Sequence, residues 1–329
     1  MARLRAGMVG LGSMGRNHAR VLGQLDGVDL VGIADPMVEG ATHGAPVVRS
    51  VEELIALGID YAVVACPTGL HEEVGLQLAE AGVSALIEKP LAHTDEAARR
   101  LAEAFESRGL VAGVGHIERY NPALRSLKAR LESGDLGEVY QIITRRQGPF
   151  PARIADVGVV KDLATHDIDL TAWVTQQDYV SVAAQTSRRS GREHEDMVAV
   201  VAHLADGSIA NHLVNWLSPF KERQTVVTGE RGAFVADTLT ADLTFCANGA
   251  VSSDWDAIRN FRGVAEGDVT RFAIPRREPL LVEHEHFRDA ILGTSKDIVT
   301  LREGLRTVEI SSAVLESART RSTVTTITA

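Results

Sequence analysis

Short apolar segments alternate with helix-like segments through the first third of the chain, and this alternation constrains the fold more than any other feature. The expected strands are residues 4–11, 28–34, 61–65, 85–87 and 110–114. The expected helices between them are residues 17–25, 51–57 and 70–81, and a further helix that Thr94 caps and Gly109 ends. Regular strand–helix alternation predicts a parallel, doubly wound sheet with helices on both faces.

A glycine-rich turn follows the first expected strand and precedes the first expected helix. It reads Gly10-Leu11-Gly12-Ser13-Met14-Gly15. Glycines at this spacing allow a tight turn, a close approach of the backbone to a pyrophosphate, and close packing of helix on strand. The N–H groups at the start of the helix are then available to the phosphates. The pattern predicts a Rossmann domain that binds a dinucleotide.

Asp35 ends the second expected strand and selects between the two nicotinamide dinucleotides. It lies about 20 residues beyond the glycine turn, where a carboxylate binds the ribose hydroxyls. It would repel the 2′-phosphate of NADP, and the following Pro36-Met37-Val38 supplies no arginine. NAD is therefore the expected cofactor. The alternative is that Asp35 only begins the turn before Pro36.

Further polar groups fall at the ends of later strands, where ligands of doubly wound sheets bind. These groups are Cys66-Pro67-Thr68, Glu88-Lys89-Pro90 and His116. Lys89 at a strand end could bind a substrate hydroxyl and stabilise the negative charge that develops on its oxygen. The alternative is a solvated surface lysine, the usual environment of this residue type.

A second candidate site lies in the stretch of residues 156–169. Asp162, His166 and Asp169 are spaced i, i+4 and i+7, so a helix would present them on one face. An imidazole beside a carboxylate suits a proton acceptor. The alternative is an exposed polar helix face without a function.

The second half of the chain has a different pattern. Expected strands at residues 139–146, 180–188, 196–204, 208–217 and 223–228 are joined at hairpin distances. They predict an open, mostly antiparallel sheet of roughly five to seven strands, covered on one face by a helix from about residue 163 to 176. We expect an α/β Rossmann domain at residues 1–120 and an α+β domain at residues 121–329 for substrate binding and oligomerisation. Its uncovered face predicts a homodimer or homotetramer.

Composition excludes several classes of protein. The 329 residues carry a net charge of −10, which argues against a nucleic-acid or anionic-membrane surface. The chain has two cysteines and no apolar run of membrane-spanning length, so we expect a cytoplasmic protein. Glu283-His284-Glu285-His286 resembles a metal cluster, but consecutive residues spread around a helix, and an exposed helix face is expected instead. No metal site is predicted, and no role is assigned to His194 between Glu193 and Glu195.

Four cations occur within residues 145–161 of this acidic chain: Arg145, Arg146, Arg153 and Lys161. Such a group suits a diphosphate or carboxylate on the substrate. Neighbouring residues of a strand point to opposite faces, so at most one of Arg145 and Arg146 can serve. Arg153, in its proline-bounded loop, is the favoured candidate.

Several of these motifs together resemble the glucose–fructose oxidoreductase/inositol dehydrogenase/rhizopine-catabolism (GFO/IDH/MocA) family. The motifs are Gly10-x-Gly12-x-x-Gly15, Asp35, Cys66-Pro67-Thr68-x-x-His71, Glu88-Lys89-Pro90 and Asp162-x-x-x-His166. The resemblance covers essentially the whole chain. It implies oxidation or reduction of a secondary alcohol on a sugar or cyclitol with a bound nicotinamide cofactor. It implies cofactor contacts by the strand-end motifs at residues 66–71 and 88–90, and a catalytic trio of Lys89, Asp162 and His166.

A narrower resemblance is to the branch of that family that oxidises the 3-hydroxyl of UDP-N-acetylglucosamine to a 3-keto sugar. Residues 115–122, 148–153 and 156–160 carry it, and Lys161 departs from it, because an apolar residue is expected there. The resemblance implies substrate contacts from Lys89, His116, Arg119, Asn121, Arg153, Lys161 and His166. The alternatives are a cyclitol dehydrogenase of the inositol type, a deoxysugar-nucleotide ketoreductase and a non-catalytic NAD-binding sensor.

Overall fold

The computed structural model describes residues 3–151, 157–249 and 266–326, which form two compact units. The first unit comprises Met1–Ile117 and Arg277–Ser312, and the second comprises Glu118–Arg276 and Ala313–Ala329. The expected boundary at residue 120 lies close to the first crossing between the units. Residues 277–312, which we expected in the second domain, instead group with the first unit.

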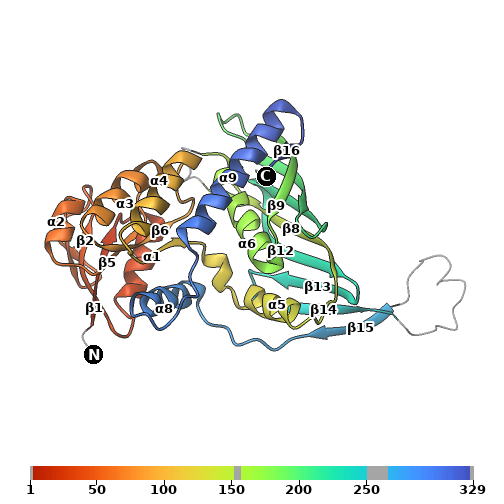
Figure 1. Cartoon of the computed structure of the whole chain (residues 1–329), viewed down its shortest axis with the longest axis horizontal. Helices are drawn as coiled ribbons and strands as arrows, with labels where there is room; N and C mark the ends of the chain where they lie inside the picture. Colours follow the sequence, from red (N-terminus) through yellow and green to blue (C-terminus); the bar gives the residue numbers. More distant parts are fainter. Residues whose placement is uncertain (1–2, 152–156, 250–265, 327–329) are drawn as a thin grey trace, which may run out of the picture. The chain divides into compact units, whose positions relative to one another are not determined.

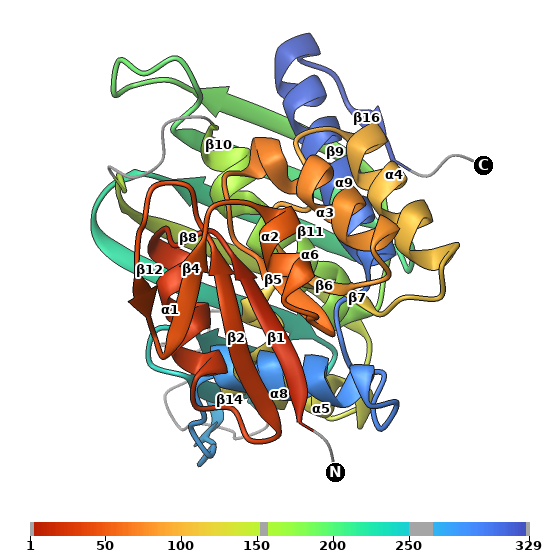
Figure 2. The same cartoon turned by 90° about the vertical axis from the view of Figure 1, so that its left-hand side faces the viewer.

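The first unit contains a seven-stranded sheet (Figures 1 and 2). Its strands are β1 (Leu4–Val9), β2 (Val28–Ala34), β3 (Ala41–Thr42), β4 (Ala45–Val48), β5 (Tyr61–Val64), β6 (Ser84–Glu88) and β7 (Ala112–Gly115). They lie in the order β3-β4-β2-β1-β5-β6-β7, parallel except for the β3–β4 pair. The parallel strands follow the doubly wound order 3-2-1-4-5-6. The expected parallel sheet is confirmed, while the short strands β3 and β4 were not predicted.

Helices cover both faces of this sheet. They are α1 (Ser13–Leu22), α2 (Val51–Ala56), α3 (His71–Glu80), α4 (Asp95–Glu106) and α8 (Pro279–Ile291), with a 3₁₀ turn η1 at Thr68–Leu70. Successive residues of β1 face opposite sides of the sheet. Ala6 and Met8 belong to the hydrophobic core cluster that includes residues of α1 and α8. A side chain at Gly7 would instead come too close to Leu54 of α2. The predicted Thr94 cap of α4 is confirmed, because its side chain accepts a hydrogen bond from the Ala97 N–H.

Helix α8 belongs to the first unit because of its apolar contacts. Phe287 is buried and packs edge to face against Tyr61, with ring centroids 5.6 Å apart. Burial of two aromatic rings contributes a large hydrophobic stabilisation, and it couples α8 to β5. A domain boundary that is predicted from local sequence patterns could not take this contact into account, because the two rings lie far apart in the sequence.

The second unit contains a nine-stranded, mostly antiparallel sheet (Figure 1). Its strands are β8 (Val139–Pro149), β9 (Tyr179–Ser187), β10 (Met197–Leu204), β11 (Ile209–Asn215), β12 (Leu217–Gly229), β13 (Gly232–Asp237), β14 (Asp242–Asn248), β15 (Glu266–Arg271) and β16 (Val324–Thr325). They lie in the order β15-β14-β13-β12-β8-β11-β10-β9-β16, and among the strands that the structure describes in this sheet only β8 and β11 pair in parallel. The sheet is larger than the five to seven strands expected, since β13 to β16 were not predicted.

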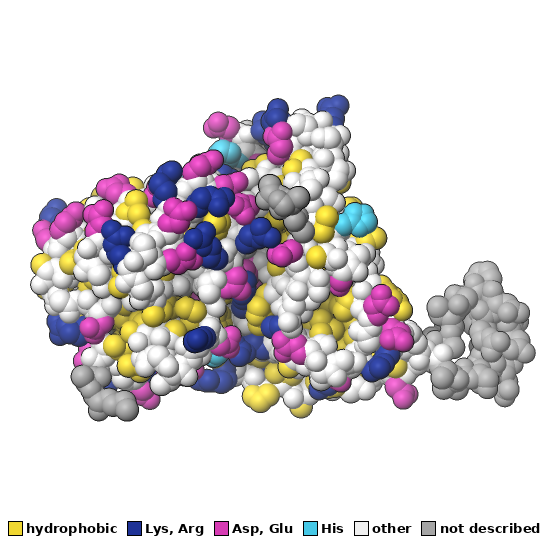
Figure 3. Space-filling model, in the orientation of Figure 1, with side chains coloured by type: hydrophobic (Ala, Val, Ile, Leu, Met, Phe, Trp, Pro, Cys, Tyr) yellow, Lys and Arg dark blue, Asp and Glu magenta, His cyan; other side chains and the backbone are white. Residues whose placement is uncertain are grey.

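Several helical segments pack in the second unit or lead into it. The 3₁₀ turn η2 (Ile117–Tyr120) precedes α5 (Pro122–Glu132), and α6 (Thr165–Thr175) covers the same face of the sheet as α5 (Figure 1). Helix α9 (Leu301–Thr320) contributes residues to both units. None of the helices that the structure describes combines the length and the apolar character that a membrane span requires. Acidic and basic side chains are interspersed over the face seen in Figure 3.

Candidate active site

The glycine turn between β1 and α1 has the geometry that its sequence predicts. Gly10 has a φ of +89°, and a Cβ there would lie 2.8 Å from the backbone N of Cys66. A Cβ at Gly15 would lie 1.9 Å from the carbonyl oxygen of Gly10. Both positions therefore require glycine. A Cβ at Gly12 would meet nothing within 4 Å, so the backbone at the start of α1 is open to a ligand.

Asp35 is held beside this turn by two backbone donors. Its Oδ2 accepts the N–H of Leu11 at 2.7 Å, and its Oδ1 accepts the N–H of Met37 at 2.8 Å. Each carboxylate oxygen can accept more than one hydrogen bond, so the ribose hydroxyls of a dinucleotide can still be bound. An open glycine turn at a helix start, with a fixed carboxylate at the end of the next strand, fits NAD. Ser13 and Met14 are the first two residues of α1, where backbone N–H groups have no hydrogen-bond partner within the helix.

His71 joins two loops that follow neighbouring strands. Its ring nitrogens lie 3.1 Å from the carbonyl oxygen of Cys66 and 3.0 Å from that of Pro90, and its side chain is buried. His71 therefore fixes the loop after β5 to the loop after β6. Burial raises the pKa of the Cys66 thiol to about 11, which makes Cys66 a poor nucleophile at neutral pH.

Strand β6 ends at Glu88, and the loop after it begins with Lys89 and Pro90, which are joined by a cis peptide bond. The carboxylate of Glu88 is buried and committed to protein groups. Its Oε2 accepts the backbone N–H of Lys89 at 3.0 Å, and its Oε1 lies 2.8 Å from Nε2 of His18 on α1. This geometry favours a role for Glu88 in holding the Lys89 backbone over the direct cofactor contact that we expected.

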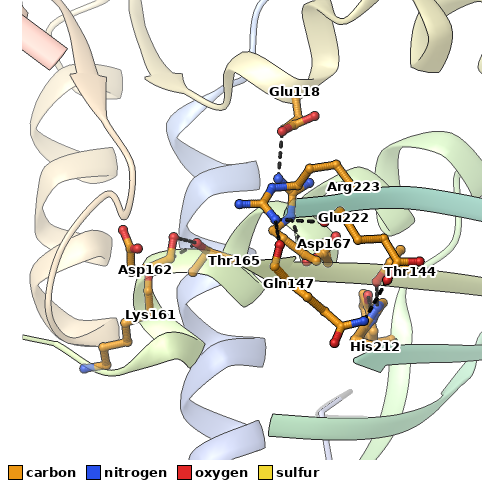
Figure 4. A network of polar contacts seen from close by, with 12 residues as sticks. Glu118, Thr144, Gln147, Lys161, Asp162, Thr165, Asp167, His212, Glu222 and Arg223 are labelled. Atoms are coloured by element: carbon orange, nitrogen blue, oxygen red, sulfur yellow. Dashed lines mark hydrogen bonds and ion pairs between the residues drawn. The ribbon is translucent and has the colours of Figure 1, made fainter. Parts of the chain in front are cut away.

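Asp162 lies in a π-helical turn, Val160–Ala164, that leads into α6. Such turns frequently occur at functional sites. Asp162 is buried, whereas His166, one turn later in α6, is partly exposed. Thr165 donates from its hydroxyl to the carbonyl oxygen of Lys161 at 3.2 Å, and Figure 4 shows the Lys161 side chain extending away from the side where Arg223 lies.

Glu195, to which no sequence motif assigns a role, anchors the start of this turn. Its backbone carbonyl accepts the N–H of Val159 at 2.9 Å, and its carboxylate accepts the N–H of Val160 at 3.1 Å. A Cβ at Gly158 would lie within 2.2 Å of that carboxylate, so glycine is needed to admit it. The glycine was the only local signal of this contact.

Buried ion pairs hold the other acids of this stretch. Arg119 donates from Nε and Nη2 to the two oxygens of Asp169. Arg146 contacts Asp167 at 3.0 Å and Glu118 at 2.8 Å. Burial by itself would lower the pKa of Arg146, but the charges of Asp167 and Glu118 outweigh it and raise that pKa.

The remaining residues that we expected to contact the substrate are Asn121, His116 and Arg153. Asn121 caps α5 by accepting the Ala123 N–H, and it donates to the carbonyl oxygen of Thr238 at 3.0 Å. Its side chain thus has a structural partner at each end. His116 is buried just beyond β7. Arg153 lies outside the described residues.

Among the described residues, no group of three or more His, Cys, Asp and Glu side chains is placed to hold a metal ion. The Glu283–His286 run differs from the expected exposed helix face in one respect. Glu283 and His284 are buried in α8, because this side of α8 packs toward α1 and His18.

Two family models match consecutive parts of the chain. Residues 4–116 match the oxidoreductase family with an NAD-binding Rossmann fold, and residues 124–235 match the GFO/IDH/MocA C-terminal domain. The chain belongs to the GFO/IDH/MocA oxidoreductase family. It is accordingly a dehydrogenase that acts on an alcohol group of its substrate, and its cofactor is NAD.

Relatives within the family act on different substrates. The chain is 29% identical, over 88% of its length and 90% of the relative, to UDP-N-acetylglucosamine 3-dehydrogenase of Acidithiobacillus ferrooxidans. It is 32% identical, over 68% of its length and 74% of the relative, to myo-inositol dehydrogenase Hyg17 of Streptomyces leeuwenhoekii. The solved structure of the Acidithiobacillus enzyme, GnnA, matches with a TM-score of 0.86 and 26% identity, covering 97% of this chain and 99% of that one.

Proposed function

We propose that this enzyme oxidises a secondary hydroxyl on a sugar, the 3-hydroxyl of a nucleotide sugar such as UDP-N-acetylglucosamine, to give a 3-keto sugar. The observation that carries the proposal is the match to UDP-N-acetylglucosamine 3-dehydrogenase, which spans 90% of that protein. Fold similarity at a TM-score of 0.86 supports it.

The residues of this chain have distinct roles in the proposed reaction. His166 accepts the proton of the hydroxyl group, and the neighbouring Asp162 orients the imidazole and supplies negative charge as that imidazole becomes positive. Lys89 binds the hydroxyl oxygen and stabilises its developing negative charge. NAD supplies the hydride acceptor when it is bound. The burial of Asp162 beside the partly exposed His166 supports this division of roles.

A cyclitol dehydrogenase is the second candidate, because the match to myo-inositol dehydrogenase Hyg17 has the higher identity of the two, 32%. That match covers 74% of the relative against 90% for the nucleotide-sugar enzyme, so we place it second. The same three side chains would serve either substrate, and they would equally serve a deoxysugar-nucleotide ketoreductase. A non-catalytic NAD sensor needs none of the three.

The decisive experiment is NADH formation, followed by absorbance at 340 nm, with UDP-sugars, deoxysugar nucleotides, inositols and free sugars. Oxidation of UDP-N-acetylglucosamine, with a 3-keto product identified by mass spectrometry, supports the proposal. Activity on inositol without activity on any nucleotide sugar would instead support a cyclitol dehydrogenase. NAD binding without turnover of any compound would favour the sensor.

We further propose a homodimer or homotetramer formed through the uncovered face of the C-terminal sheet. Val201 of β10 and Ile209 and Leu213 of β11 are exposed on these paired strands. Exposed apolar side chains grouped on adjacent strands are typical of subunit interfaces. Sedimentation velocity of the wild type against Leu213→Glu tests this, and a wild-type monomer would contradict it.

A further inference from the structure

A group of buried polar side chains lies behind Lys89 within the first unit. His18 comes from α1, Glu88 from the end of β6, and Glu283 and His284 from α8, and none of the four is more than 7% exposed. Buried ionisable residues are uncommon unless they are paired. The sequence motifs assign a role only to Glu88.

Three contacts connect His284 to the backbone of Lys89. Nε2 of His284 lies 2.8 Å from Nδ1 of His18, and Nε2 of His18 lies 2.8 Å from Oε1 of Glu88. The other oxygen of Glu88 accepts the Lys89 N–H at 3.0 Å. Both ring nitrogens of His18 and both carboxylate oxygens of Glu88 are therefore engaged, which fixes the orientation of each group.

The charges within this chain of contacts can be assigned. Burial alone would raise the pKa of Glu88, but its hydrogen bond to His18 and the charges of His18 and Lys89 bring that pKa below its ordinary value. Glu88 is thus ionised at neutral pH and can only accept, so Nε2 of His18 carries a proton. Burial and the charge of His18 lower the pKa of His284 well below its ordinary value, so His284 is neutral.

Glu283 does not compete with Glu88 for His18. Burial raises the pKa of Glu283 well above its ordinary value, and the charge of Glu88 raises it further. Of the two buried carboxyl groups, Glu88 therefore carries the charge and Glu283 keeps its proton. The ionisable groups of this cluster are Glu88 at the end of β6, Lys89 in the loop that follows, His18 from α1, and Glu283 and His284 from α8.

We infer that His18 and His284 are positioning residues for Lys89: they orient the ionised Glu88, which in turn holds the Lys89 backbone. The inference rests on the proposed function, in which Lys89 binds the oxygen of the oxidised hydroxyl. Displacement of a reacting group by about 1 Å can cost on the order of 100-fold in rate. Loss of the contact between His284 and His18 can therefore affect turnover, although this contact does not involve the substrate.

The kinetic test compares His284→Leu with His284→Gln. Leucine fills the buried space but cannot form a hydrogen bond with His18, whereas the glutamine amide can occupy the place of the Nε2 group. We expect His284→Leu to lower kcat by about 10-fold, within the range for misplaced groups, while the Kd for NAD stays within about 2-fold, which is less than 0.5 kcal/mol. His284→Gln should restore most of kcat.

His286→Leu is the matched control, because His286 lies on the same helix but contacts the carbonyl oxygen of Asp297 and is not part of the chain of contacts. It should keep the wild-type kcat. Wild-type kcat in His284→Leu, or an equal loss in the control, would overturn the inference.

A second measurement does not depend on turnover. In ¹⁵N-histidine NMR of the wild-type protein, Nε2 of His18 should carry a proton and Nδ1 of His18 should show a hydrogen bond to His284. That Nδ1 signal should shift in His284→Leu and be retained in His284→Gln. A His18 ring protonated on Nδ1 alone would overturn the inference. If no substrate is oxidised, the proposed function fails, and this spectrum still decides whether the chain of contacts exists.

Discussion

Arg119 and Asp169 form a buried, two-pronged ion pair in which Nε and Nη2 of the guanidinium donate to the two carboxylate oxygens at 2.8 and 2.6 Å. The two side chains are 8% and 1% exposed. Arg119 was expected to bind substrate, but its guanidinium is occupied in joining η2 to α6. Its geometry therefore supports a structural role.

Replacing Arg119 by lysine should destabilise the protein without a specific effect on substrate binding. Lysine cannot make the paired contact, and a buried carboxylate that loses its partner costs roughly 3–5 kcal/mol. Urea unfolding should show a lower midpoint, while KM at a temperature where the variant is folded stays close to the wild type. Arg319→Lys is the control, because Arg319 pairs with Glu316 on the exposed surface of α9. A raised KM with unchanged stability would instead support a substrate-binding role for Arg119.

Replacing His166 by asparagine should remove turnover while NAD still binds. Loss of a general base typically costs about 10²- to 10⁴-fold in rate, and His166 lies in the second unit, outside the Rossmann domain that binds NAD. The measurements are kcat on the accepted substrate and the Kd for NAD by calorimetry. His43→Asn, at an exposed position in the turn between β3 and β4, is the control. Full turnover in His166→Asn would mean that another group accepts the proton.

Local sequence patterns predicted the Rossmann sheet well because its determinants are local. The parallel strands of that sheet are mostly apolar segments, and Gly15 is required by a contact with Gly10, only five residues earlier. The burial of Glu283 and His284 could not be predicted in this way. It depends on His18, 266 residues away from His284, and the alternating acids and histidines resemble an exposed helix face. Glu195 is a similar case, since only the fold brings its carboxylate to the start of the π-helical turn.

Replacing Asp35 by alanine should weaken NAD binding and reduce its preference over NADP. The carboxylate is held by the N–H groups of Leu11 and Met37, so it presents fixed acceptors to the ribose hydroxyls. Hydrogen bonds to charged groups contribute roughly 1.5–3 kcal/mol, which corresponds to about a 10- to 100-fold rise in Kd. The affinity for NADP should change less, because the variant also loses the repulsion of the 2′-phosphate. An equal loss for both dinucleotides would instead indicate damage to the loop.

Replacing Glu283 by glutamine should stabilise the protein at neutral and alkaline pH. Burial raises the pKa of Glu283 well above its ordinary value of 4.5, so the folded protein keeps a proton that the unfolded chain releases. The wild type therefore loses stability as the pH rises above about 4.5 towards the raised pKa. Glutamine resembles the protonated carboxyl group and does not titrate. Melting curves should coincide near pH 4 and separate by at least about 2 °C at pH 8, as expected from a difference of about 1 kcal/mol. A variant that is less stable than the wild type at pH 8 would show that Glu283 is ionised and paired in the folded protein.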